Sequence, residues 1–207
     1  MGSENISTFG FENEDIKGGI YDKYKGKKGV TDRGAIVYSD PTAMFAGAKI
    51  HFKDRFFLCK KGLCCEKLGA AKWRVGAVLV KYGTDKFGVL KEPFSYELYP
   101  WIFSETTFIK LKAVDKEFLL TTHDIKISCT NEEYQHIEIV PCNESIWRVK
   151  EALRAKILKE ATPIWEYIKR GIASDLSAEE IKDLLTANTG TADPTTHVDL
   201  DSVLNKI

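Results

Sequence analysis

The chain has 207 residues, of which 43% are hydrophobic and 29% charged, and its 30 Lys and Arg balance its 30 Asp and Glu. This composition is typical of one globular domain with an appendage, and no apolar run approaches the roughly 20 residues of a membrane helix, so we expect no membrane partner. The polar, acidic start lacks the pattern of a signal peptide, and five Cys is an odd number. We therefore expect a cytoplasmic protein whose Cys are free thiols or metal ligands rather than disulfides.

The charges are unevenly distributed along the chain. Between Lys17 and Lys81 there are 15 Lys or Arg against 5 Asp or Glu, whereas between Ala173 and Ile207 there are 2 against 7. A basic cluster raises the local concentration of polyanions and speeds their association. Uneven charge also arises by chance in soluble proteins, but an excess of this size favours a polyanionic partner.

Residues 1–24 are predicted to be a flexible N-terminal arm, and the body follows over residues 25–142. The pattern of the body predicts strands at residues 33–38, 48–58, 72–82, 87–98, 123–130 and 134–140. The centre of the strand at 72–82 is continuously apolar, which is typical of a strand buried on both faces. One helix is predicted from Ser104 to about Glu117. No βαβ repeat is visible, so the sequence predicts an α+β fold whose core is a small β-barrel of the OB-fold type.

Residues 143–187 are predicted to form a helical C-terminal extension. The apolar spacing predicts a helix from Ser145 to Ala161, a break at Thr162-Pro163, and a second helix up to Gly171. Residues 188–207 are expected to be an acidic C-terminal tail.

A further helix start is indicated near residue 177. Ser177 and Glu180 have the spacing of a capping box, and Leu176 and Ile181 that of a hydrophobic staple. This pattern predicts a short amphipathic helix that begins after Ser177.

A Cys-rich knuckle is predicted at residues 51–65, with His51, Cys59, Cys64 and Cys65 as candidate zinc ligands. Thiolates and imidazole are suitable ligands for tetrahedral zinc. Adjacent residues of a strand point to opposite faces, however, so Cys64 and Cys65 reach one ion only if the backbone bends. The alternative is three thiols that pack as small hydrophobic side chains.

The other Cys give no sign of catalysis. Cys129 and Cys142 follow late strands and are expected in the core. A nucleophilic Cys would need a base such as His123 or His136, and nothing in the sequence places either one beside a thiol. A nuclease would need clustered carboxylates, in which the strands are poor. We therefore expect a protein that is not an enzyme.

Cations and aromatic rings alternate along the predicted strands and loops of the body. Proteins hold single-stranded nucleic acid with a basic track and with rings that stack on the bases. The candidate nucleic-acid-binding residues are Lys27, Lys28, Arg33, Lys53, Arg55, Phe57, Lys60, Lys72, Trp73, Arg74, Tyr82, Lys86, Tyr99 and Trp101. Most aromatic residues of a barrel pack in its core, so we expect only two or three of the rings to contact a ligand.

Four segments resemble the single-stranded DNA-binding, helix-destabilising proteins of large tailed bacteriophages of the T-even type. These are GKKGVTDRGAIVYSDP, AKIHFKDRFFLCKKGLCCEKLG, KWRVGAVLVKYGTDKFG and WIFSETTFIKLKAV. The resemblance covers roughly residues 25–141 and implies an OB-fold with one structural zinc ion, held here by His51, Cys59, Cys64 and Cys65. It also implies cooperative self-association on single-stranded DNA in the cytoplasm of a bacterial host.

The resemblance implies a role in phage DNA replication, recombination and repair, with sequence-nonspecific binding through a basic, aromatic groove. The acidic C-terminus would then contact replication or recombination proteins. The alternative is a replisome or transcription accessory protein that acts through protein contacts of its helical C-terminus.

Overall fold

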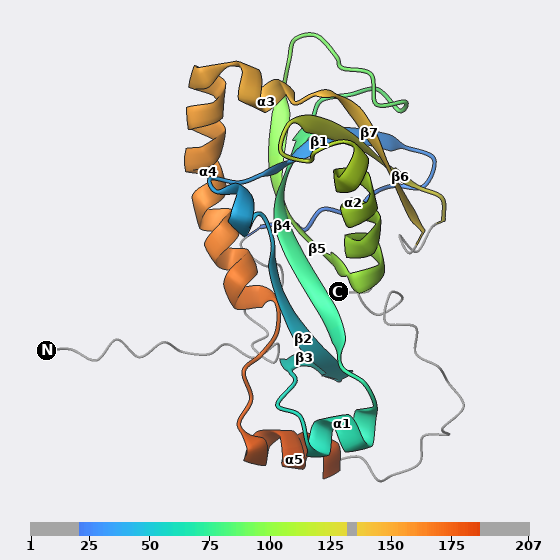
Figure 1. The fold of residues 1–207 in the computed structure, drawn as a ribbon, viewed down its shortest axis with the longest axis vertical. Coiled ribbons are helices and arrows are strands. Elements are labelled where there is room, and N and C mark those ends of the chain that lie inside the picture. The colour runs from blue at the N-terminus through green and yellow to red at the C-terminus, as the bar shows by residue number, and fades with distance from the viewer. Residues whose placement is uncertain (1–20, 132–135, 187–207) are drawn as a thin grey trace, which may run out of the picture.

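The computed structural model describes residues 21–131 and 136–186, and within them the chain forms a seven-stranded antiparallel sheet and five helices (Figure 1). The predicted tail at 188–207 and most of the predicted arm lie outside the described residues. The strands are β1 (Thr31–Val37), β2 (Ala46–Lys53), β3 (Arg55–Leu58), β4 (Lys72–Tyr82), β5 (Tyr96–Ser104), β6 (His123–Cys129) and β7 (Ile137–Glu144). The helices are α1 (Leu63–Leu68), α2 (Glu105–Glu117), α3 (Ile146–Val149), α4 (Glu151–Gly171) and α5 (Ala178–Thr186), with a 3₁₀ turn η1 at Pro41–Ala43.

The 11-residue strand β4 organises the sheet. Along one edge its first half pairs with β2, with Ala46 opposite Gly76, and its second half pairs with β1, with Val37 opposite Val78. β5 pairs along the whole other edge. The order of the remaining strands is β3-β2-β4-β1-β6-β7, and no pairing in the described part of the chain joins the two ends. The mixed α and β character is confirmed, but the sheet is open, so the predicted closed barrel is not confirmed.

β4 is buried on both faces, as its apolar centre predicts. Val75, Ala77 and Leu79 face one core, which α2 covers, while Val78 and Val80 face a second core, which α4 covers. Both faces are apolar because each is covered by a helix. The helix α2 was predicted within one residue of its observed start.

The helix α4 shares a core with the sheet and runs unbroken through Pro163. The predicted break there is wrong. Ile157, Ala161, Ile164 and Ile168 are buried on one stripe that spans the proline, and this burial outweighs the missing N–H. α4 also approaches β4 closely, because a Cβ atom on Gly76 would lie 2.4 Å from Cγ2 of Ile168.

Other parts of the chain also differ from the sequence-based expectation. The single strand predicted at 48–58 is a hairpin, because β2 ends at Lys53 and β3 begins at Arg55 and pairs with it. Residues 83–95 form a loop, so the strand predicted at 87–98 begins only at Tyr96. Tyr24, expected in the flexible arm, is buried against Trp101, and its hydroxyl donates to the carboxylate of Asp32 at 2.9 Å. The arm is therefore anchored to the body at Tyr24.

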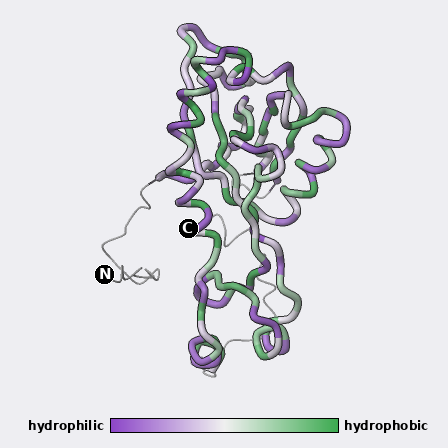
Figure 2. Tube along the Cα trace, turned by 60° about the vertical axis from the view of Figure 1, so that its left-hand side comes forward, coloured by the Kyte–Doolittle hydropathy of each residue, from purple (hydrophilic) through white to green (hydrophobic). Residues whose placement is uncertain are grey.

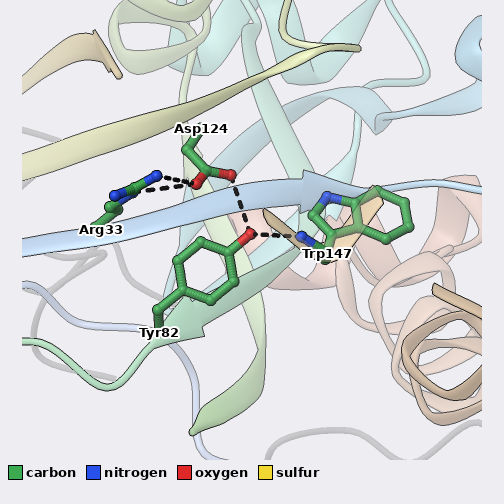
Figure 3. Close-up of polar contacts among 4 residues, drawn as sticks. All are labelled: Arg33, Tyr82, Asp124 and Trp147. Carbon is green, nitrogen blue, oxygen red and sulfur yellow. Dashed lines mark hydrogen bonds and ion pairs between the residues drawn. The ribbon is translucent and has the colours of Figure 1, made fainter. Parts of the chain in front are cut away.

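A buried polar network ties three strands to α3 (Figure 3). Arg33 of β1 donates to Asp124 of β6 at 2.9 and 3.1 Å, and the hydroxyl of Tyr82 donates to the other oxygen of Asp124 at 3.0 Å. The backbone N–H of Trp147 donates to the Tyr82 hydroxyl at 3.3 Å. Burial raises the pKa of Asp124, and the bond from Tyr82 and the charge of Arg33 oppose this rise.

The lower end of the molecule in Figure 1 is a narrow extension, which we call the distal module (residues 49–69 and 174–186). It contains the hairpin of β2 and β3, with α1 and α5 side by side at its tip, and Figure 2 shows the same pair of short helices from another side. The capping box is confirmed, since Ser177 N donates to Glu180 and Glu180 N donates to Ser177. No helix in the described ranges is long and apolar enough to cross a membrane.

Candidate metal centre and basic groove

Four side chains that can ligate a metal meet in the distal module. His51 comes from β2, Cys59 follows β3, and Cys64 and Cys65 belong to α1. One ligand atom from each lies within 4.8 Å of the others. These are the four residues that the sequence analysis names, and the structure brings all of them together.

The distances fit a single tetrahedral ion. The Sγ atom of Cys59 lies 4.0 Å from that of Cys64 and 3.4 Å from that of Cys65, and Cys65 Sγ lies 3.5 Å from Nε2 of His51. Zinc bonds of about 2.3 Å to sulfur and about 2.0 Å to nitrogen place two sulfurs about 3.8 Å apart and a sulfur and a nitrogen about 3.6 Å apart. The cluster can therefore hold a metal ion with little rearrangement.

The local backbone explains how adjacent Cys reach one point. Lys61 and Gly62 have φ of 62° and 57°, so the chain turns sharply after Cys59 and enters α1. Successive residues of a helix are about 100° apart rather than 180° apart. The objection that adjacent residues of a strand point to opposite faces therefore does not apply to Cys64 and Cys65, because both lie in a helix.

The pKa values of the candidate ligands shift in different directions. Burial lowers the pKa of His51, which keeps its imidazole neutral. Burial raises the pKa of Cys59, but a 3.4 Å bond from the N–H of Lys61 and the neighbouring thiols outweigh it and lower the pKa overall. The bond with Cys59 raises the pKa of Cys65 to about 11. Of Cys59 and Cys65, Cys59 thus has the lower pKa.

Four of the predicted nucleic-acid-binding residues are core residues. Phe57, Arg74, Tyr82 and Trp101 have at most 3% of their surface exposed. They lie at buried positions of their strands. The alternation of cations and rings along the sequence does not reveal this burial. Because they are buried, no ring or guanidinium face is open to a nucleic-acid base. We therefore exclude these four as nucleic-acid-binding residues.

The guanidinium of Arg74 illustrates this burial. It donates from NH1 to the carbonyl of Ile172 at 2.8 Å and lies 4.0 Å from the centre of the Phe56 ring. Burial lowers its pKa to about 10. Arg33 is half-buried, and its guanidinium forms an ion pair with Asp124 (Figure 3).

The remaining predicted residues form two groups at opposite ends of β4. One group surrounds the distal module and consists of Lys53, Arg55, Lys60, Lys72 and Trp73. The other lies near the end of β4 and consists of Lys27, Lys28, Lys86 and Tyr99. An 11-residue strand is about 33 Å long, so the two groups do not form one compact site. Lys53 and Lys60 are also engaged, by the carbonyl of Leu185 and the carboxylate of Asp175.

A groove of about 480 Å³ lies at the second group, between the segment before β1 and the loop from β4 to β5. Its lysines are Lys25, Lys27, Lys81 and Lys86, and Tyr96 lines it as well. Lys25, Lys81 and Tyr96 were not among the predicted binding residues. Lys25 belongs to the lysine-rich run before β1, which is a usable signal, but only the fold places Lys81 and Tyr96 beside that run.

Two exposed rings project from the loop that forms one wall of the groove. Phe87 is 64% exposed and Phe94 is 38% exposed, and the ammonium of Lys86 lies 5.0 Å from the centre of the Phe87 ring. Both rings fall within the strand predicted at 87–98, and their exposure follows from the loop that the chain forms there instead.

The comparisons with known proteins do not identify the chain. Neither the protein-family models, nor the curated proteins, nor the solved structures contain a match to it.

Proposed function

We propose that the protein binds single-stranded DNA without sequence preference and carries out no reaction. The observation that carries this proposal is the groove at the end of β4, because four lysines line it and the exposed ring of Phe87 lies beside one of them, Lys86. A basic track holds the phosphates, and rings such as Phe87 stack on bases, each stack contributing about 1–3 kcal/mol.

The charges around the groove support this proposal. Three carboxylates line the groove with the lysines, and each has a partner within the protein. Asp32 is engaged by Tyr24 and Lys81, Asp85 accepts the backbone N–H groups of Phe87 and Val89, and Glu97 accepts the hydroxyl of Tyr99. In contrast, Lys25, Lys27 and Lys86 take part in no ion pair within the described residues. Three lysines are therefore available to phosphate groups.

The proposal assigns a structural zinc ion to His51, Cys59, Cys64 and Cys65. Three thiolates and one imidazole form a soft donor set that is typical of zinc, and four protein ligands leave no open position for a substrate. Such an ion stabilises the fold around it and performs no chemistry. The proposal agrees with the resemblance to phage single-stranded DNA-binding proteins and keeps their OB-fold as a hypothesis for the open sheet.

A fluorescence titration with oligo-dT at 50 and 200 mM salt tests the proposal, with oligo-rU compared under the same conditions. Three or four phosphate contacts predict that affinity falls roughly 20- to 50-fold over this range. Tighter binding of oligo-dT supports DNA as the ligand, whereas tighter binding of oligo-rU would assign the groove to RNA. Absence of binding, or an affinity that salt does not change, would refute the proposal.

A further inference from the structure

The helix α5 packs directly on the residues of the metal cluster. Phe57, Cys64, Leu176 and Ile181 are buried together in a small core of their own. Residues that are partly buried against this core are Cys59, Cys65, Leu68, Leu184 and Leu185. Three of the four candidate ligands therefore contribute to the surface that α5 covers.

The backbone before α5 is also joined to the cluster. Ser174 lies beside β3 in a parallel bridge with Phe57, where Leu58 N donates to Ser174 O at 2.9 Å and Ser174 N donates to Phe56 O at 3.0 Å. β3 ends at Leu58, immediately before Cys59. Cys59 therefore directly follows β3, the strand to which Ser174 is hydrogen-bonded.

Two polar contacts close the same interface. Lys53 donates to the carbonyl of Leu185 at 3.3 Å, near the end of α5, and Lys60 forms an ion pair with Asp175. Lys60 belongs to the turn between Cys59 and Cys64. The position of this turn therefore affects the cluster and the C-terminal segment together.

Neither helix of the interface is stable by itself. α1 has 6 residues and α5 has 9, and isolated helices shorter than about 12 residues are marginal in water. The small core that joins them has four buried side chains, one of which is the thiol of Cys64. A metal ion that fixes the turn, α1 and β2 in one arrangement would fix the surface on which α5 packs.

We propose that the metal ion acts as a latch, which keeps residues 174–186 docked on the distal module and releases them when it is lost. This inference rests on the proposed metal centre. Coupling between two events is reciprocal, so docking of α5 raises the affinity for the metal by the same factor. The metal would thereby control where residues 187–207 are attached to the body.

Hydrogen exchange of the full chain, with bound zinc measured in the same samples, tests the latch. Removal of zinc by a chelator is expected to raise the exchange rate of amides in 174–186 at least tenfold, while those of Ile157 to Ile168 in α4 change less than twofold. If the protein loses its zinc but exchange in residues 174–186 is unchanged, the latch is overturned, whereas the assignment of the metal centre still holds. An equal rise in α4 also overturns it, because zinc would then stabilise the whole fold.

The reciprocal experiment measures zinc affinity by competition with a chromophoric chelator. Ile181→Ala removes a buried side chain that does not touch the ion, and it is expected to weaken zinc binding at least tenfold. Lys182→Ala, on the exposed side of α5, serves as the matched control and is expected to change the affinity less than twofold. Equal affinities in the two variants overturn the latch, whereas a protein that takes up no zinc overturns the metal centre and the latch with it.

Discussion

The Nε2 atom of His51 lies 3.5 Å from the Sγ atom of Cys65, although 14 positions separate the two residues in the chain. The hairpin of β2 and β3 returns the chain to His51, and the turn at Lys61 and Gly62 directs α1 toward it. Four donor atoms converge from a strand, a turn and a helix, which no single element could achieve. This convergence is the physical basis for expecting a metal ion.

The first prediction concerns the ligands of this ion. Cys65→Ser replaces a soft thiolate with a hydroxyl, and zinc affinity is expected to fall more than about 100-fold, since even residues that only support a ligand change affinity about 10- to 100-fold. Metal analysis and chelator competition measure the effect. Cys142→Ser changes a half-buried thiol outside the cluster and is expected to retain zinc. Equal zinc contents in the two variants would contradict the assignment.

The second prediction concerns the network of Tyr82. Tyr82→Phe leaves one oxygen of Asp124 and the N–H of Trp147 without the hydroxyl partner that they have in the native protein. A buried polar group without a partner costs about 1–3 kcal/mol, so the free energy of unfolding should fall by about that amount. Urea unfolding measures it. Tyr96→Phe, whose hydroxyl contacts exposed Glu160, is the control and should change stability by less than about 0.5 kcal/mol.

The third prediction is a loss of stability in alkali. Burial raises the pKa of Tyr24, and the carboxylate of Asp32 raises it further. The phenol of the unfolded chain ionises near pH 10, so the stability that Tyr24 contributes is complete below about pH 10 and declines above it, by about 1.4 kcal/mol per pH unit. Tyr24→Phe is expected to show a shallower decline in urea unfolding between pH 9 and 11. Parallel curves for the two proteins would show that Tyr24 is not responsible.

The sequence predicted those features that depend on local pattern. The apolar centre of β4, the range of α2 and the capping box of Ser177 and Glu180 are all as expected, because each follows from the spacing of neighbouring side chains. The four candidate metal-ligating residues were also named from the sequence, and the structure brings them together. Pro163 was misinterpreted, since local propensity favours a break there and only tertiary burial overrides it.

The binding residues were harder to predict, for a physical reason. Arg74 and Trp101 have the residue types of a nucleic-acid site, yet both are buried, because β4 and β5 are covered on both faces. Which face of a strand meets solvent depends on the helices that pack on it, and these come from distant parts of the chain. Phe87 shows the converse, since its exposure follows from the loop that replaces the predicted strand.

The fourth prediction concerns the proline within α4. Pro163 is exposed and lacks the N–H that would bond the carbonyl of Lys159. Pro163→Ala restores this bond and removes the clash of the ring, so the free energy of unfolding should rise by about 1–3 kcal/mol. Urea unfolding provides the measurement. Glu166→Ala, on the exposed side of the same helix, is the control and should not stabilise the protein. A loss of stability in Pro163→Ala would show that the helix depends on the ring of the proline.

The fifth prediction tests the groove. Phe87→Ala removes the most exposed ring of its wall, and affinity for oligo-dT should fall about 10-fold, which is equivalent to the loss of one stacked base. The slope of affinity against salt should stay the same, because no cation is removed. Lys86→Gln should instead reduce that slope by about 0.7, the contribution of one phosphate contact on a single strand.

The matched control for Phe87 is Phe118, which is 41% exposed and follows α2 rather than belonging to the loop beside the groove. Phe118→Ala should leave the affinity for oligo-dT within twofold of the native value, because Phe118 does not belong to the loop beside the groove. Both variants remove an exposed aromatic ring, so a general effect of surface hydrophobicity would weaken binding in both. A selective loss in Phe87→Ala assigns the bases to the groove, whereas equal losses would place the bound strand elsewhere.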